Sequence, residues 1–214
     1  MERPSAEVAP QLLGLVLVRE APGGLSGGII VEAEAYAGAD DRASHARAGR
    51  TTRTGPMFGP AGHAYVYLVY GLHHCLNVVT EGEGSAGAVL VRALLPTFGL
   101  EQIRTRRGRS SERDARLAAG PARLCEALAI DRSQDGRDLL GRGPLRLLRP
   151  AEGWPVPEAA ILRGPRVGIA YAGPDWSERP WRFGIADSPA LSRPFPEASR
   201  IPATGQPAVG GPDD

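Results

Sequence analysis

The chain has 214 residues, of which 42% are hydrophobic, and a formal net charge of +1 at pH 7. These values are typical of a globular protein with one core, and they do not by themselves indicate a nucleic-acid binder, although total charge hides local patches. Because no apolar run approaches the ~20 residues needed to cross a bilayer, and the N-terminus lacks the apolar stretch of a secretory signal, we expect a cytoplasmic protein without a membrane partner.

The first two predicted strands cover residues 12–20 and 27–36 and are separated by the turn signal APGG. Side chains alternate between the two faces of a strand. One face of the second strand is typical of a core: Ile29, Val31, Ala33 and Ala35. The opposite face carries two carboxylates and a phenol: Ile30, Glu32, Glu34 and Tyr36. That face is either an ordinary solvent-exposed surface or part of a site, and the alternation alone does not decide.

A polar loop rich in glycine and arginine follows, and residues 63–80 then predict two strands around Gly71. Tyr65 and Tyr67 fall on one face of the first of these strands, whereas Tyr70 lies beside Gly71 at the predicted tip. Buried tyrosines in a strand usually pack in a core or an interface, and the alternative for Tyr65 and Tyr67 is a site. An aromatic side chain at a projecting tip is harder to explain by packing.

The rest of the chain predicts a strand over 87–96, helices over 96–107 and 120–130, and a strand pair over 164–173 and 180–187. After Asp187 the chain contains six prolines and no periodicity. We therefore expect one α+β domain with a mainly antiparallel sheet over residues 1–188 and a tail of low order over residues 189–214.

Several residue types limit the chemistry. The segment 103–116 carries six arginines, which form either a solvated face or a phosphate contact. His73 and Cys75 share a strand face, but two ligands do not make a zinc site, so we expect no metal. All 25 basic residues are arginine, and the chain therefore has no lysine to form a Schiff base.

Several segments, in this order, resemble the alkyladenine (3-methyladenine) DNA glycosylase family: VEAEAYAGADDRASHA, MFGPAGHAYVYLVYG, CLNV, AVLVRALLP, GPARLCEALAI and PRVGIAYAG with the later PWRF. The match extends from about Leu13 to about Pro189. The resemblance implies a curved sheet with flanking helices and a protruding β-hairpin, in a monofunctional base-excision repair enzyme. It also implies double-stranded DNA containing damaged purines as the partner, no cofactor, and a monomer found in the cytoplasm or on the bacterial nucleoid.

The resemblance assigns catalytic roles residue by residue. Glu34 matches the glutamate that activates the attacking water, whereas Glu32 does not occupy the catalytic position. Arg92 matches an arginine that helps to position this water, and the main-chain carbonyl of Val167 matches a further water contact. The residues alone leave open that Arg92 is a structural arginine paired with a carboxylate such as Glu34.

The resemblance also assigns base recognition. Tyr36, His45 and Tyr67 match aromatic residues that stack around the flipped base, and His45 also offers its backbone amide to the base edge. Asn77 matches the residue that crowds the 2-amino group of guanine, and Tyr70 matches the side chain that intercalates in the gap. Taken alone, His45 also fits a loop histidine and Asn77 also fits a polar residue at a sheet edge.

Four lesions are compatible with the resemblance: 3-methyladenine, 7-methylguanine, hypoxanthine and ethenoadenine. Without a lysine, we expect hydrolysis that leaves an abasic site and does not cut the strand. Arg47, Arg50 and Arg53 are candidates for phosphate contacts. The alternative is a non-catalytic module that binds lesions or RNA, and a hydrolase of free nucleosides is a third possibility that gives Tyr70 no use.

Overall fold

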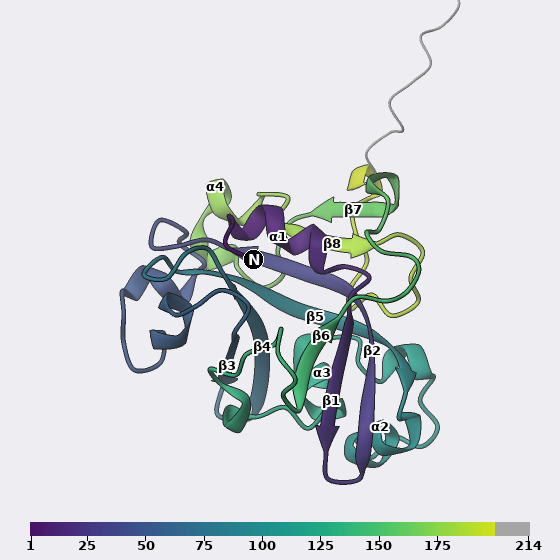
Figure 1. The fold of residues 1–214 in the computed structure, drawn as a ribbon. Coiled ribbons are helices and arrows are strands. Elements are labelled where there is room, and N and C mark those ends of the chain that lie inside the picture. The colour runs from purple at the N-terminus through teal and green to yellow at the C-terminus, as the bar shows by residue number, and fades with distance from the viewer. Residues whose placement is uncertain (200–214) are drawn as a thin grey trace, which may run out of the picture.

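Eight strands join one curved antiparallel sheet, shown in Figure 1 for a computed structural model that describes residues 1–199. The neighbouring strands follow the order β3-β4-β5-β2-β1-β6, while β8 pairs with both β2 and β7. The strand bounds are β1 Val16–Ala21, β2 Gly24–Tyr36, β3 Ala64–Val69, β4 His73–Thr80, β5 Gly87–Phe98, β6 Leu145–Leu148, β7 Ile161–Gly164 and β8 Arg182–Ile185. The expected α+β class with a mainly antiparallel sheet is confirmed.

Three short helices cover one face of this sheet. These are α1 Ser5–Leu12, α2 Leu100–Arg107 and α3 Pro121–Ala127, while α4 Pro174–Ser177 lies outside this layer. Val8, Ile103 and Leu124, one from each helix of the layer, are buried in the same core cluster as the sheet. Helix α3 begins at Pro121 as predicted, because the first turn of a helix does not use the N–H that proline lacks. No helix in residues 1–199 is long and apolar enough to cross a membrane.

Strand alternation gives the sheet one core face and one polar face. Four residues from β2 to β5 pack in the core with the helices: Ala35, Val66, Val78 and Val91. Their neighbours in sequence point the other way: Glu34, Tyr36, Tyr65, Tyr67, Asn77 and Arg92. The polar face therefore collects side chains that are separated by up to 58 positions in the sequence.

A register irregularity in β2 alters the alternation that the sequence predicts. The pairing of β2 with β5 shifts between Ile30 and Ala33. Ile30 consequently packs in the main core, whereas Val31 packs with Ala93 in a separate small cluster. The predicted partition of Ile29 to Val31 between the two faces is therefore wrong, because one extra residue in a bulge exchanges the faces.

The two glutamates of β2 are also not on a solvated surface. Glu32 and Glu34 have 0% exposure, because β5 and β8 flank β2 at this point and loops cover the polar face. The reading of an ordinary solvent-exposed sheet face is thereby excluded for both residues. Buried carboxylates require partners, which turn out to be arginines and hydrogen-bond donors.

Strands β3 and β4 pair antiparallel, with Val69 opposite His73. Between them the amide of Leu72 donates to the carbonyl of Val69 at 3.0 Å, and both Tyr70 and Gly71 have positive φ, at 51° and 69°. This is the conformation of a type I′ turn, for which glycine is well suited. The turn leaves Tyr70 91% exposed.

Other expectations need correction. Pro96 belongs to β5, and helix α2 starts only at Leu100. The strand that pairs with β8 is Ile161–Gly164, while residues 165–173 form a loop that contains the 3-10 helix Ala170–Ala172. Neither α1 nor β6 is among the predicted elements.

The sequence predicted that the domain ends at residue 188, but the residues directly after it still pack against the sheet. Within the described part of the segment, Ser192 hydrogen-bonds Glu32 and Phe195 packs against Gly184. The remainder of the expected tail, residues 200–214, lies outside the described residues.

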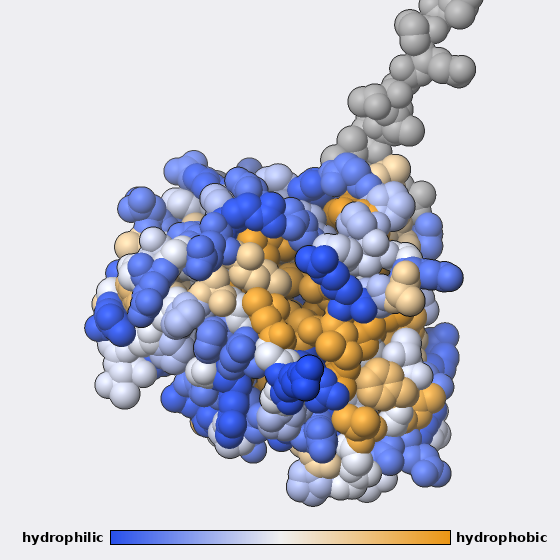
Figure 2. Space-filling view, viewed as in Figure 1, coloured by the Kyte–Doolittle hydropathy of each residue, from blue (hydrophilic) through white to orange (hydrophobic). Residues whose placement is uncertain are grey.

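The face drawn in Figure 1 carries apolar surface in its middle. Figure 2 shows this surface as a band over the region of α1, β6 and β1, with hydrophilic side chains around it. Leu148 of β6 is among the exposed large hydrophobic residues.

Candidate active site

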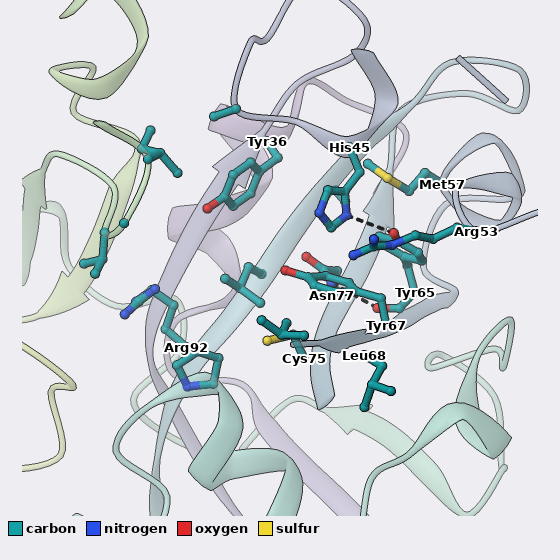
Figure 3. A pocket seen from close by; sticks show the side chains of 18 of the residues that line it. Tyr36, His45, Arg53, Met57, Tyr65, Tyr67, Leu68, Cys75, Asn77 and Arg92 are labelled. Atoms are coloured by element: carbon teal, nitrogen blue, oxygen red, sulfur yellow. Dashed lines mark hydrogen bonds between the residues drawn. The ribbon is translucent and has the colours of Figure 1, made fainter. Parts of the chain in front are cut away.

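A cavity of about 440 Å³ opens between the polar face of the sheet and two loop regions, 43–57 and 167–171. Figure 3 shows it with Arg92 at one end and Arg53 at the other, and with Tyr36 and His45 facing the space between. Seven of the predicted site residues line this cavity: Tyr36, His45, Tyr67, Tyr70, Asn77, Arg92 and Val167. The fold thus brings together residues that span 132 positions of the sequence.

The eighth predicted residue, Glu34, lies directly behind Tyr36, Arg92 and Val167. We call these four residues the charged wall. Oε2 of Glu34 accepts from the Tyr36 hydroxyl at 2.9 Å and lies 3.2 Å from Nη1 of Arg92. Its Oε1 accepts from the amide of Val167 at 2.7 Å. A carboxylate offers about four acceptor positions, so two hydrogen bonds and one ion-pair contact leave at least one for a further partner.

The protonation of the charged wall follows from its neighbours. Burial lowers the pKa of Arg92, but the Glu34 and Glu32 carboxylates outweigh it and raise the pKa above its ordinary value. Burial and then the Glu34 charge raise the pKa of Tyr36 well above its ordinary value. Arg92 is therefore a cation and Tyr36 a neutral phenol that can donate to Glu34.

The opposite side of the cavity, which we call the aromatic wall, consists of His45, Tyr65, Tyr67 and Asn77. Nδ1 of His45 lies 3.0 Å from the Tyr65 hydroxyl, and the rings of His45 and Tyr67 meet edge to face with centroids 4.5 Å apart. Asn77 donates from Nδ2 to the backbone carbonyl of Tyr65 at 3.0 Å. These contacts hold the four side chains in one arrangement (Figure 3).

The aromatic wall carries no formal charge at neutral pH. Burial, together with the nearby Arg53 charge, lowers the pKa of His45 to about 4. Burial raises the pKa of both Tyr65 and Tyr67. Tyr70, at the turn between β3 and β4, also lines the cavity while most of its ring faces solvent.

Comparisons with known proteins decide the family. A sequence model of the methylpurine-DNA glycosylase (MPG) family matches residues 1–189. The chain belongs to this family. Similar curated proteins carry the printed name "Putative 3-methyladenine DNA glycosylase": one from Myxococcus xanthus is 48% identical over 94% of this chain and 95% of its own length. One from Streptomyces avermitilis is 49% identical over 89% of this chain and 87% of its own length, and one from Methanocella arvoryzae is 44% identical over 91% and 94%.

As a member of the methylpurine-DNA glycosylase family, the protein is a DNA glycosylase, and its substrate is DNA. The family resemblance predicted from the sequence is confirmed, and so is the enzyme class. The roles of the individual site residues remain predictions. The amide of Val167 donates to Glu34, and the expected contact of its carbonyl with a water stays a prediction.

A buried ion pair supports the charged wall of this glycosylase. Arg166 and Asp41 both have 0% side-chain exposure, and their two hydrogen bonds measure 2.6 and 3.0 Å. Arg166 also lies 4.7 Å from the centre of the Tyr36 ring and directly precedes Val167. Asp41 lies in the segment VEAEAYAGADDRASHA, which resembles the family. This position was the sequence signal that Asp41 belongs near the site.

The aromatic wall also has two neighbours that sequence reasoning did not place in the cavity. The guanidinium of Arg53, a candidate for phosphate contact, lies 5.3 Å from the centre of the Tyr67 ring and lines the cavity. Cys75 lines it from β4, opposite Tyr67 in the strand register. Their positions follow from loop geometry and strand pairing, which no local pattern specifies.

The arginine-rich segment 103–116 lies elsewhere and makes contacts within the protein. Arg104 pairs with Asp114, and Arg107 pairs with Glu126. Arg106 donates to Ser26 and to backbone carbonyls. For these arginines the contacts favour a structural role.

Proposed function

We propose that this DNA glycosylase rotates a damaged purine nucleotide out of duplex DNA into the cavity and hydrolyses its N-glycosidic bond with a water that Glu34 activates. The observation that carries the proposal is the Glu34 carboxylate, buried at the charged wall and bonded to Tyr36, Arg92 and Val167. The reaction leaves an abasic site for the later steps of base excision repair.

The chemistry of the bond explains the need for this carboxylate. The glycosidic bond of a purine nucleotide breaks through a sugar with oxocarbenium character. A fixed carboxylate can accept the proton of the attacking water and also stabilise the positive charge that develops on the sugar. The acceptor position left on Glu34 is available to the water, and Arg92 holds the carboxylate in place without neutralising it by proton transfer.

Recognition of the base takes place between the two walls. A planar base stacks between Tyr36 on one side and His45 and Tyr67 on the other, and stacking contributes roughly 1–3 kcal/mol per base. The neutral state of His45 suits this task, since an imidazolium would repel a base that is itself cationic. Asn77, held by its bond to the Tyr65 carbonyl, crowds the position of a guanine 2-amino group and thus excludes normal guanine.

Tyr70 occupies the gap that the rotated nucleotide leaves in the duplex. Minor-groove proteins often insert an apolar or aromatic side chain between base steps. A 91% exposed tyrosine at a tight turn has the required exposure, and the adjacent Leu72 is 76% exposed. Base rotation is needed because the target bond is not accessible inside a stacked duplex.

The proposed substrates include 3-methyladenine, the lesion named for the relatives, together with 7-methylguanine, hypoxanthine and ethenoadenine. Alkylation at N3 or N7 makes the purine cationic and weakens the glycosidic bond, so such bases leave with little acid assistance. Since the chain has no lysine, the mechanism does not proceed through a Schiff base of a side chain, and the strand stays intact.

The test is single-turnover base release from duplex oligonucleotides, each with one of the four lesions, with and without later alkali. We expect release that depends on the lesion, strand breaks only after alkali, and a loss of roughly 10²- to 10⁴-fold in Glu34→Gln. Glu83→Gln, an exposed glutamate, is the matched control and should retain the wild-type rate. Tight lesion binding without release would replace the proposal with a non-catalytic binding module.

A further inference from the structure

A second buried carboxylate lies behind the charged wall. Glu32, two residues before Glu34 on β2, has 0% exposure and receives Nε of Arg92 at 2.9 Å and Nη1 of Arg182 at 3.3 Å. It contacts Arg92 on the side away from Glu34, so one guanidinium links the two carboxylates. Glu32 has no place in the proposed reaction, and its position requires another explanation.

Ser192 completes this arrangement from a distant part of the chain. Its amide donates to Oε2 of Glu32 at 2.6 Å, and its hydroxyl donates to Oε1 of Glu32 at 2.9 Å. The same hydroxyl accepts from Nη2 of Arg92 at 3.1 Å. A hydroxyl can act as donor and acceptor at once, so one oxygen links the acid and the base of the cluster.

With this contact, each of the three nitrogens of Arg92 has its own partner. Nε points to Glu32, Nη2 to Ser192 and Nη1 to Glu34. A planar guanidinium held at three points cannot rotate without breaking at least one of these bonds. The orientation of Nη1 toward Glu34 therefore depends on contacts on the far side of the group.

The segment that carries Ser192 is itself fixed to the body of the enzyme. Arg182 donates from Nη2 to the carbonyl of Pro194 at 2.8 Å, and its guanidinium lies 3.8 Å from the centre of the Phe195 ring. Arg116 donates to the carbonyl of Leu191 at 2.8 Å. These contacts hold the backbone on both sides of Ser192.

We propose that Ser192 is a positioning residue for base excision, which holds Arg92, through its hydroxyl and Glu32, in the orientation that serves Glu34. The inference rests on the proposed function, because it assigns Ser192 a task only if Glu34 and Arg92 perform the chemistry. Ser192 lies beyond residues 1–189, which match the family, and in a stretch that composition assigned to a tail.

The test compares Ser192→Ala with the wild type in two assays. In single-turnover base release from the duplex lesion that the wild type processes fastest, we expect a loss of roughly 10- to 100-fold, because small displacements of catalytic groups have large effects. In binding to a duplex with a tetrahydrofuran abasic-site analogue, we expect no change. Ser192→Thr retains the hydroxyl and should restore most of the rate.

Ser188→Ala is the matched control, since it makes the same change in the same segment at a hydroxyl that, within residues 1–199, accepts from the nearby amide of Ala190, and it should release base at the wild-type rate. If Ser192→Ala does not fold, Ser192→Cys replaces it, because a thiol of similar size is a weak hydrogen-bonding group. A rate within twofold of wild type in the folded variant, or an equal loss of binding and rate that threonine does not restore, contradicts the inference.

Glu34→Gln, measured in parallel, separates the two proposals. If Glu34→Gln releases base at the wild-type rate, the proposed function is wrong whatever Ser192 does. If Glu34→Gln is inactive while Ser192→Ala is normal, only the positioning role of Ser192 is wrong.

Discussion

The two walls of the cavity are built in opposite ways. In the charged wall, Glu34 and Arg92 are buried, and the atoms that face each other are bonded at 3.2 Å or less. The aromatic wall has no formal charge at neutral pH and continues into the exposed turn at Tyr70. The difference separates two tasks: preorganised charges suit a bond-breaking step, while neutral rings beside an exposed turn suit contact with DNA.

The sheet explains this difference. Glu34 lies on β2, which pairs with β5 on one edge and with β8 on the other. Tyr67 lies on β3, at the end of the strand order in the described residues. A central strand can bury charge because its neighbours supply partners, whereas an end strand remains accessible to a ligand.

The largest effect should come from breaking the support of the charged wall. Arg166→Met leaves Asp41 as a buried carboxylate without its arginine, which should lower the free energy of unfolding by about 3–5 kcal/mol. Chemical denaturation at pH 7 measures this change. Since Arg166 also stacks on Tyr36, base release should fall even where the variant is folded.

Arg163→Met is the control for that change. It removes the same side chain from the same part of the chain, but Arg163 pairs with Glu158 at the surface, where the two side chains are 30% and 58% exposed. Exposed pairs contribute about 0–1 kcal/mol, so the variant should stay within about 1 kcal/mol of wild type. Equal losses of unfolding free energy in the two variants would show that burial does not strengthen the contribution of the Arg166 pair to stability.

A smaller effect should appear when the turn beside the aromatic wall is changed. Tyr70→Ala removes the side chain that we propose fills the duplex gap, so release from a duplex lesion should fall roughly 10- to 100-fold, equivalent to ~1–3 kcal/mol of stacking. Release from the same lesion in a single strand should be unchanged, because no gap forms there. Leu25→Ala, at an exposed hydrophobic residue near the start of β2, serves as the control.

An unchanged duplex rate in Tyr70→Ala would separate Tyr70 from base rotation and remove the functional contrast between the walls. An equal loss on both substrates would instead place Tyr70 in the binding of the base itself.

The smallest effect concerns protonation of the aromatic wall. Because the folded-state pKa of His45 is lowered to about 4, the unfolded chain binds more protons than the native state between about pH 4 and pH 6.5. Stability from this residue is complete above pH 6.5 and is lost as the pH falls toward 4. Between pH 7 and pH 5 the loss should be about 1 kcal/mol, after allowance for solvent screening.

His45→Gln should remove this part of the pH dependence, so that the difference in unfolding free energy between pH 7 and pH 5 becomes smaller than in wild type. His73→Gln, an exposed histidine, should keep the wild-type dependence. If both variants behave alike, His45 is not held neutral by the pocket.

Much of this contrast could be predicted from the sequence, since alternation and turn chemistry are local. The sequence correctly predicted Tyr67 in a strand, Tyr70 at the turn between β3 and β4, and the start of α3 at Pro121. The resemblance supplied Glu34 and Arg92 together. Without the resemblance, strand alternation leaves open whether the glutamates of β2 lie on a solvent-exposed face or in a site.

The rest depended on contacts between distant segments. The bulge near Glu32 is set by the pairing of β2 with both β5 and β8, which no single-strand pattern contains. Ser192 lies in a proline-rich stretch whose order comes from Arg182 and Glu32, far away in the sequence. Arg166 and Asp41 are 125 positions apart, and neither residue type predicts burial on its own.

The pairing of β8 with β2 also has a consequence for how the enzyme is made. Glu32 leaves the ribosome 150 residues before its partner Arg182 and 160 residues before its partner Ser192. Until they arrive, the carboxylate pair of β2 lacks part of its compensation and cannot be buried as it is in the finished sheet. The buried cluster around Glu32 can therefore form only after residue 192 has been synthesised, and a ribosome that stops before residue 182 releases a product without it.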